Sequence, residues 1–445
     1  MSYGNAFSNK PFERASKTAH TQIINDPDVK SFISSCHLPP LLGEIDKNDL
    51  KLNTLSDIAS KPIKHYFAID GGYSNVVVRP QFPSATFAFF QFGALYFSGK
   101  DLAELEQKPF IDPSDMSKLQ QIERFKLQIP TKGITLKTEN GLISSVRKSI
   151  HDFFISKPER QSSFASALKW LVFEEFDKST SVDTWKLSSC PSCGEGVHIE
   201  KSSLGTNYKA LCPVCNADVF LTDIFRLHEA IDNELGAGGI LGYLTTTVEQ
   251  IIVAYLIKQM LTTKSDLLGE VLFIKDGPLA FFGQTANMHK PMRKLIGYLQ
   301  ANYNIFLAGV EKSGAFVEHA AQMSHNFSSG QYMVLGNKYI YKYIIPGKSE
   351  IDKPYASTTY YGHKVIFKSE DGNMYVVTIP CQDLLVEPQP SDLKNLEVIL
   401  RNVSTLKCDL YSSSLMPIVL VNKLVSLASH PSSDLLRTFT QATLG

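Results

Sequence analysis

The sequence predicts an α/β protein, in which helices flank a mixed sheet and a small cysteine-rich insertion interrupts the chain. Three observations support this fold class. Helix-like and strand-like patterns alternate between residues 245 and 323, as they do in βαβ units. The run EVLFIKDG at 270–277 is almost continuously apolar, which is typical of a strand covered on both faces. Two close cysteine pairs, CPSC and CPVC, lie between residues 190 and 215.

Residues 1–60 are polar and weakly periodic, and we interpret them as an N-terminal arm with a short helix near 29–36. From residue 65 we expect two or three strands rich in aromatic and β-branched residues, with a turn at Gly71 and Gly72 and with Asp70 ending the first strand. Helical spacing follows at 142–155 and 166–176. Together, residues 61–185 form the first part of the predicted core.

The second part of the predicted core spans residues 222–445, after a zinc ribbon at 186–221. Its predicted helices are 221–239, ended by glycines, then 245–261, 288–303, 316–323, 392–406 and 417–430. Its predicted strands are 270–277, 304–314, 338–346 and a hairpin at 364–380.

The composition describes an ordinary globular protein of 445 residues with 43% hydrophobic residues. Lys+Arg and Asp+Glu both number 44, so the whole chain has no strong field that would attract nucleic acid over a distance. The N-terminus lacks the apolar core of a signal peptide, and no window approaches the roughly 18 apolar residues of a membrane span. We therefore expect a cytoplasmic protein that is not in the membrane.

Four of the seven cysteines form the two pairs Cys190/Cys193 and Cys212/Cys215. Their separation is typical of a four-thiolate zinc site, and four thiolates leave no open position for water, so the predicted zinc is structural. The alternative is a pair of redox CxxC motifs. The prolines within both pairs, and Gly194 after the first, favour the metal site.

Three carboxylates stand out because of where they occur. Asp70 and Asp276 each end an apolar strand-like run and precede a glycine, and Glu249 shares the apolar face of the 245–261 helix. Converging carboxylates are the ligands that Mg²⁺ or Mn²⁺ prefers, and two such ions about 4 Å apart can promote phosphodiester cleavage. The alternatives are that both aspartates form turns and that Glu249 pairs with a lysine such as Lys258.

Four segments, AIDGGYSNV, VEQIIVAYL, FIKDGPLAFFG and LAGVEKSGAF, resemble the NurA nuclease family, specifically members with a zinc-ribbon insertion, over roughly residues 60–430. The resemblance implies a ribonuclease-H-like core and a Mn²⁺-dependent DNA nuclease. It also implies a homodimer that works with a HerA-type hexameric DNA-translocating ATPase in end processing or antiviral defence. The family's acidic residues would fall on Asp70, Glu249 and Asp276, as found above.

Two further residues match the family pattern. Lys312 matches a basic position that can bind the scissile phosphate, although a solvated loop lysine explains it equally well. Asn422 stands where the family usually has a histidine. Its carbonyl oxygen can ligate a metal, but its amide cannot shuttle a proton. The histidines that can substitute are His319, His325 and His363.

Basic residues follow the Asp276 strand at Lys290, Arg293 and Lys294, where a DNA backbone can approach, although a solvated helix face is the plainer alternative. His228 and Asp232, four residues apart on a predicted helix, can be interpreted either as two metal ligands or as a surface ion pair. No P-loop is present, so energy to move DNA must come from a partner. Against the nuclease stands one rival from another class, a non-catalytic DNA-binding adaptor that recruits a motor.

Overall fold

The computed structural model describes residues 23–36, 45–56, 61–79, 81–100, 122–156, 162–346, 352–408 and 414–427. The chain divides into two units, Met1–Lys47 and Asn48–Gly445. In the first unit, helix α2 (Pro27–Ser35) begins where the side chain of Asp26 accepts a hydrogen bond from the amide of Asp28. All elements described below belong to the second unit. The predicted boundaries at residues 60, 185 and 221 stay predictions.

The strands of the second unit are β1 (Asn53–Thr54), β2 (His65–Arg79), β3 (Phe82–Ser98), β4 (Ile122–Lys132), β5 (Thr184–Leu187), β6 (Val197–Glu200), β7 (Lys209–Leu211), β8 (Asp218–Phe220), β9 (Val271–Asp276), β10 (Phe306–Glu311), β11 (Gln331–Val334), β12 (Gly362–Lys368) and β13 (Met374–Pro380). Its α-helices are α5 (Leu142–Ile155), α6 (Phe164–Val172), α7 (Leu241–Thr263), α8 (His289–Asn302), α9 (Ala315–Gln322), α10 (Asn337–Tyr339), α11 (Leu396–Thr405) and α12 (Met416–Val425).

A nine-stranded sheet organises this unit within the described residues, in the order β1-β11-β12-β13-β10-β9-β2-β3-β4. β2, β3 and β4 form an antiparallel meander, and β9 and β10 then add to the other side of β2, parallel to it. The five strands β10-β9-β2-β3-β4 are therefore all parallel except β3, which is antiparallel to its neighbours. This is the strand arrangement of a ribonuclease-H-like sheet. The predicted mixed sheet flanked by helices is confirmed.

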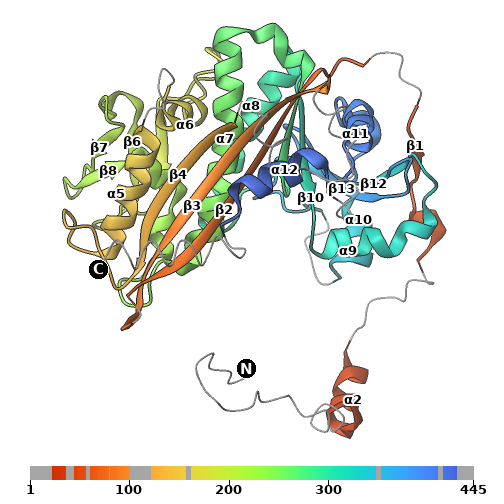
Figure 1. Cartoon of the computed structure of the whole chain (residues 1–445), viewed down its shortest axis with the longest axis horizontal. Helices are drawn as coiled ribbons and strands as arrows, with labels where there is room; N and C mark the ends of the chain where they lie inside the picture. Colours follow the sequence, from red (N-terminus) through yellow and green to blue (C-terminus); the bar gives the residue numbers. More distant parts are fainter. Residues whose placement is uncertain are drawn as a thin grey trace. The chain divides into compact units, whose positions relative to one another are not determined.

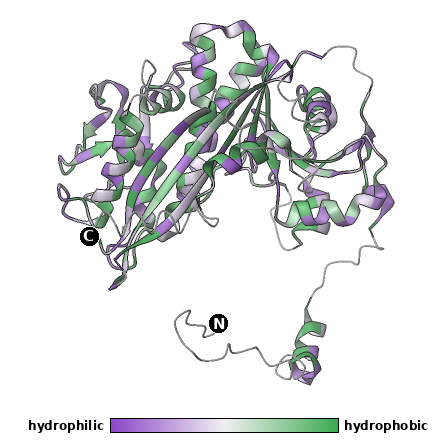
Figure 2. Ribbon diagram, in the orientation of Figure 1, coloured by the Kyte–Doolittle hydropathy of each residue, from purple (hydrophilic) through white to green (hydrophobic). Residues whose placement is uncertain are grey.

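Helices cover both faces of the sheet, so its central strands are largely hydrophobic (Figure 2). On one face, α5, α6, α7 and α8 build one core with residues such as Phe273 and Leu307. On the other face, α11 and α12 build a second core with Leu272 and Phe306. The segment Gly238–Thr263, which contains α7, is long and apolar enough to cross a membrane, but 83% of its apolar 18-residue window is buried, and α7 is the core helix of the sheet.

The turn predicted at Gly71 and Gly72 is wrong, because β2 continues through both residues to Arg79. Asp70 therefore lies inside a long strand rather than at its end. A Cβ atom on Gly71 would lie 2.7 Å from the Phe92 ring, and one on Gly72 would lie 2.8 Å from the carbonyl oxygen of Val425. The two glycines thus serve close packing on both faces of the sheet instead of chain reversal.

Two other predicted elements are wrong. The helix expected at 221–239 forms short 3₁₀ turns at Leu221–Phe225 and Leu227–Ala230, separated by Arg226 with a φ of 60°. The strand expected at 338–346 is instead helical, through α10 and a π turn at Ile340–Ile344. Lys338 and Lys342, four residues apart, both bind Asp49, which requires helical rather than extended spacing.

Candidate active site and cysteine cluster

The strand register places Asp70 beside Asp276. β2 and β9 are parallel with Ile69 opposite Lys275, so the residues that follow these two are neighbours. Glu249 approaches from α7, and all three carboxylates line one cavity of about 330 Å³. The structure thus places the three acidic residues selected from the sequence around one cavity, at the carboxyl ends of β9 and β10, although their oxygens are not all within 4.8 Å of one another.

Asp70 is 3% exposed and has one oxygen without a partner. Its Oδ1 accepts a hydrogen bond from the amide of Gly71 at 2.8 Å. Its Oδ2 is buried and has no partner with hydrogen-bond geometry among the residues that the structure describes, although the side-chain amide of Asn422 on α12 is near enough to lower the Asp70 pKa. Leaving such an oxygen unpaired costs free energy, so this position favours a ligand that can bind a carboxylate.

Lysines hold the other two carboxylates. The Nζ of Lys275 lies 2.8 Å from Oε2 of Glu249, and the exposed fractions of these side chains are 2% and 7%. The Nζ of Lys312 lies 2.7 Å from Oδ2 of Asp276, with exposed fractions of 27% and 20%. The lysine considered for Glu249, Lys258, instead donates to Ser166. Lys275 was not predicted as a site residue.

Burial sets the proton affinity of this cluster. Burial, followed by the negative charges of Asp276 and Glu249, raises the pKa of Asp70 to about 8, while Lys312 and the side-chain amide of Asn422 oppose this rise. Burial also raises the pKa of Glu249, against the opposing charge of Lys275. Carboxylates that resist ionisation in this way are stabilised when a cation joins them.

We expect Asp70→Asn to stabilise the protein when no divalent cation fills the acidic cluster. Between the ordinary pKa of 3.8 and the folded pKa of about 8, the folded chain keeps a proton that the unfolded chain has released. The free energy of unfolding therefore falls as pH rises through this window. The substitution should flatten this dependence and raise stability at pH 8 by about 1–3 kcal/mol. Urea unfolding at pH 5 and pH 8 measures both effects, and parallel pH profiles would contradict the assignment.

A second buried ion pair borders the cavity. Glu311, the last residue of β10, lines it and accepts a hydrogen bond from Lys364 of β12. The ammonium of Lys364 lies 4.3 Å from the ring centroid of Phe316 and 4.8 Å from that of Tyr360. Burial lowers the pKa of Lys364, and Glu311 opposes this. The pair is neutral overall, and neither residue is among the site residues predicted from the sequence.

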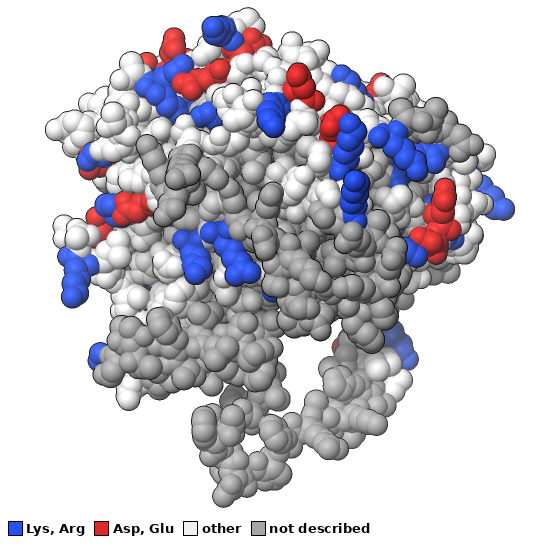
Figure 3. All heavy atoms as spheres, turned by 45° about the horizontal axis from the view of Figure 1, so that its top comes forward, with Lys and Arg blue, Asp and Glu red and all other residues white. Residues whose placement is uncertain are grey.

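The remaining predicted site residues lie outside the cavity lining. Asn422, on α12, influences the pKa of Asp70 as noted. Arg293 is half-buried and donates to the backbone carbonyls of Ser357 and Tyr360, whereas Lys290 and Lys294 are exposed. On the described part of the face in Figure 3, basic and acidic side chains are interspersed. DNA binding by these three basic residues stays a prediction.

The histidines considered as substitutes for the family histidine have other partners. His319 hydrogen-bonds the hydroxyl of Tyr339 at 2.9 Å, and His363 accepts from the amide of Leu385 at 3.0 Å. His325 contacts the carbonyl of Gln322. None of these three residues lines the carboxylate cavity.

The four cysteines form a cluster with the geometry of a metal site. Their sulfur atoms all lie within 4.8 Å of one another, and no other such group occurs in the described part of the chain. The Sγ distances Cys190–Cys215 and Cys193–Cys212 are 3.8 and 3.9 Å. A tetrahedral zinc with Zn–S bonds of about 2.3 Å separates its sulfurs by about 3.8 Å. The thiolates therefore fit a zinc ribbon, as predicted from their spacing.

Both cysteine pairs sit in equivalent loops. After each second cysteine comes a residue with positive φ, Gly194 (78°) and Asn216 (59°). The amide of Gly194 bonds the carbonyl of Cys190, and that of Asn216 bonds the carbonyl of Cys212. Two matching loops that face one another across the sulfur cluster favour one shared metal over two separate redox pairs.

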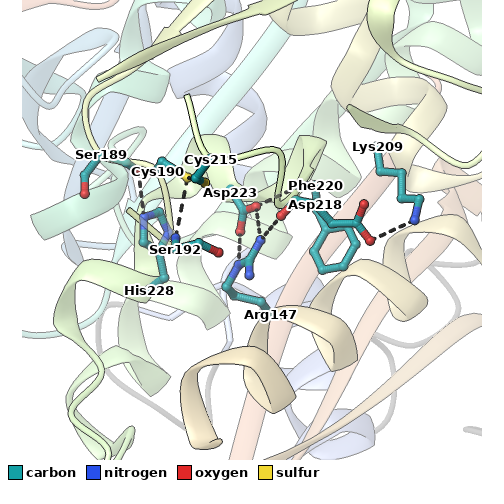
Figure 4. A network of polar contacts seen from close by, with 10 residues as sticks. All are labelled: Arg147, Ser189, Cys190, Ser192, Lys209, Cys215, Asp218, Phe220, Asp223 and His228. Carbon is teal, nitrogen blue, oxygen red and sulfur yellow. Dashed lines mark hydrogen bonds and ion pairs between the residues drawn. The ribbon is translucent and has the colours of Figure 1, made fainter. Parts of the chain in front are cut away.

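A polar network joins this ribbon to α5 (Figure 4). Arg147 of α5 donates two hydrogen bonds of 2.8 Å to Asp223, and a third to the carbonyl of Asp218 at the start of β8. His228 bonds the carbonyl of Ser189, next to the first cysteine, at 3.0 Å. His228 therefore joins the ribbon rather than pairing with Asp232, which caps the amides of Glu234 and Leu235.

Arg147→Met should lower the free energy of unfolding by about 3–5 kcal/mol, because it leaves the buried carboxylate of Asp223 without its counter-ion. The matched control is Arg226→Met, which breaks the more exposed pair with Glu229 and should cost less than about 1 kcal/mol. Chemical denaturation of both variants measures the difference. Equal losses would show that the Arg147 network does not fasten the ribbon.

No protein-family model matches the sequence, and no curated protein matches it. The structure is similar to that of the NurA nuclease from Sulfolobus solfataricus, with 9% identity and a TM-score of 0.36 over 97% of this chain and 98% of that one. It is also similar to a NurA structure, with 10% identity and a TM-score of 0.28 over 94% and 96% of the two chains. A NurA structure with manganese shares 9% identity and a TM-score of 0.28 over 88% and 91%.

Proposed function

We propose that this protein is a divalent-cation-dependent deoxyribonuclease whose centre is Asp70, Glu249 and Asp276. The observation that carries the proposal is the unpartnered, buried Oδ2 of Asp70, in a cavity that two further carboxylates line. Evolution rarely retains such a costly group without a use, and hard oxygen ligands in a cavity suit Mn²⁺ or Mg²⁺. The sequence resemblance supplies the substrate class, DNA.

Each residue of the proposed centre has a separate role in the cleavage of DNA. Asp70, Glu249 and Asp276 would hold the cation, which supplies positive charge for the phosphate and lowers the pKa of water. Lys312 is partly exposed at the rim, so its ammonium can move from Asp276 to a non-bridging phosphate oxygen. Asn422 can orient the phosphate or a water through its amide, but it cannot carry a proton. A proton from the attacking water must therefore leave through solvent or a carboxylate.

Zinc at Cys190, Cys193, Cys212 and Cys215 has a structural role in this proposal. Four thiolates fill its coordination, so the ion has no open position for a substrate. The ribbon's apolar residues, such as Leu187 and Val219, belong to the same core as α5 and α6. Zinc binding would therefore stabilise the layer that supports α7 and Glu249.

The partner proposal rests on the sequence resemblance alone. It comprises a homodimer in the cytoplasm that receives DNA from a HerA-type hexameric ATPase, in repair or in antiviral defence. The chain has no net charge, so no strong electrostatic field of its own attracts DNA. This agrees with delivery of the DNA by a partner. Lys290, Arg293 and Lys294 remain the proposed contacts with the DNA backbone.

The test is cleavage of linear DNA by the purified, zinc-loaded protein with Mn²⁺, with Mg²⁺ and without either ion, each with and without the ATPase. We expect cleavage only when a divalent cation is present. Cleavage that is unchanged without the cation would contradict the proposed chemistry. DNA or ATPase binding with no cleavage under any condition would instead favour the non-catalytic adaptor.

A further inference from the structure

Lys275 occupies an unusual position for a lysine. It lies on β9 immediately before Asp276, is 2% exposed, and is among the largest fully buried side chains of the described chain. Its Nζ is 2.8 Å from Oε2 of Glu249 and also donates to the carbonyl oxygen of Asp276. An ammonium is rarely buried so deeply unless its partners are fixed in place.

The ammonium of Lys275 engages Oε2 of Glu249, and the other carboxylate oxygen, Oε1, lies against the backbone of Gly71. A Cβ atom on Gly71 would lie 3.1 Å from Oε1 of Glu249, so this second oxygen points at the backbone next to Asp70. Oδ2 of Asp70 is the unpartnered oxygen of the same cavity. The oxygens of Asp70, Glu249 and Asp276 do not form a group within 4.8 Å of one another, as the cysteine sulfurs do. A single cation would therefore bind at Asp70 and draw in Oε1 of Glu249 and an oxygen of Asp276 as these side chains turn, while Oε2 of Glu249 remains with Lys275.

The two lysines of the site differ in their freedom to move. Lys312 has an exposed fraction of 27% and follows the end of β10, so it can turn outward when a cation or phosphate arrives. Lys275 has an exposed fraction of 2% and is held between Glu249 of α7 and the carbonyl oxygen of Asp276 at the wall of the cavity, so it stays in place. Once Lys312 has turned outward and a bound cation has displaced the proton of Asp70, three carboxylates and one fixed ammonium leave two negative charges. One divalent cation neutralises these charges and a second would overcharge the site.

From this geometry we infer that Lys275 takes the place of a second metal ion, so that the acidic cluster binds a single divalent cation. The inference rests on the proposed function and refines it, because the sequence analysis considered two ions. In this arrangement the ammonium of Lys275 supplies a fixed positive charge beside Glu249, and only the cation at Asp70 exchanges with solvent.

Electron paramagnetic resonance of Mn²⁺ titrated into the zinc-loaded full-length chain tests the inference by counting bound ions without measuring cleavage. We expect about one Mn²⁺ per wild-type chain at saturation and about two in Lys275→Met, which frees Oε2 of Glu249. Lys275→Gln should also bind about two, and it keeps an amide donor for Glu249 in case the methionine variant is unstable. The control is Lys258→Met, which removes a half-buried lysine on the same helix as Glu249 and should keep the wild-type count.

Binding of two Mn²⁺ ions by the wild-type chain would overturn the inference and leave the nuclease proposal standing. Binding of only one Mn²⁺ ion by a folded Lys275 variant would have the same two consequences. An absence of Mn²⁺ binding to the wild type would defeat the proposed acidic centre, and with it the inference. If neither Lys275 variant folds, the number of Mn²⁺ ions bound by the wild-type chain still decides the question, because the inference requires one ion and not two.

Discussion

Asp276→Asn is expected to lower the rate of metal-dependent DNA cleavage by about 10²–10³-fold or more. The substitution keeps the shape of the side chain but removes a negative charge beside Asp70, at the end of β9. Cation affinity and the position of Lys312, which binds Oδ2 of Asp276, should both change. Initial rates on linear DNA across a Mn²⁺ titration measure the loss, and excess Mn²⁺ should restore little of it.

The matched control is Asp371→Asn. Asp371 also precedes a glycine with positive φ, Gly372 at 84° compared with Gly277 at 79°, but it lies in the turn between β12 and β13. This variant should cleave DNA at the wild-type rate. If Asp276→Asn also retained full cleavage, Asp276 would have no part in the chemistry.

Cys193→Ser is expected to remove zinc and to unfold the ribbon. Structural zinc sites contribute about 10–16 kcal/mol in isolated zinc-finger peptides, because metal binding and folding are coupled. Here the ribbon shares its core with α5 and α6, so losing the metal should destabilise the whole sheet layer on that face. We expect zinc content to fall from about one ion per chain to near zero, and the free energy of unfolding to fall by on the order of 5 kcal/mol.

Metal analysis and thermal denaturation of Cys193→Ser measure these two losses, with Cys36→Ser as the control. Cys36 is exposed and lies outside the cluster, so zinc content and stability should not change. Zinc loss without any loss of stability would show that the metal does not support the core. A disulfide within either pair of the purified protein would favour the redox alternative.

Local patterns in the sequence were sufficient for most of the sheet, for the cysteine cluster and for selecting three acidic residues that line one cavity. Alternating helix and strand patterns predicted α7, β9, α8 and β10 in order, and these elements set the parallel register that brings Asp70 beside Asp276. Glu249 was identifiable because a carboxylate on an apolar helix face is costly. The cysteine spacing predicted the cluster, since that motif is local to two hairpins, β5–β6 and β7–β8.

Two of the site's lysines, Lys275 and Lys364, were not predictable in the same way, whereas Lys312 was selected from the sequence. Lys275 lies two residues after Phe273 on β9 and therefore shares its face of the strand, but a lysine at this position has no distinctive pattern. Only the packing of α7 over this face shows the pair with Glu249. Likewise, Lys364 meets Glu311 from a strand more than fifty residues away. The turn predicted at Gly71 and Gly72 was wrong because both tight turns and close packing favour glycine. The sequence alone does not show which of these two causes applies.

Crystals soaked in Mn²⁺, with anomalous diffraction recorded near the manganese and zinc absorption edges, test the central claim most directly. The account predicts a manganese peak in the cavity, bound to Oδ2 of Asp70 and to oxygens of Glu249 and Asp276, together with a zinc peak among the four cysteines. A zinc peak at the cysteines with no manganese at Asp70, or with manganese bound only elsewhere, would contradict it.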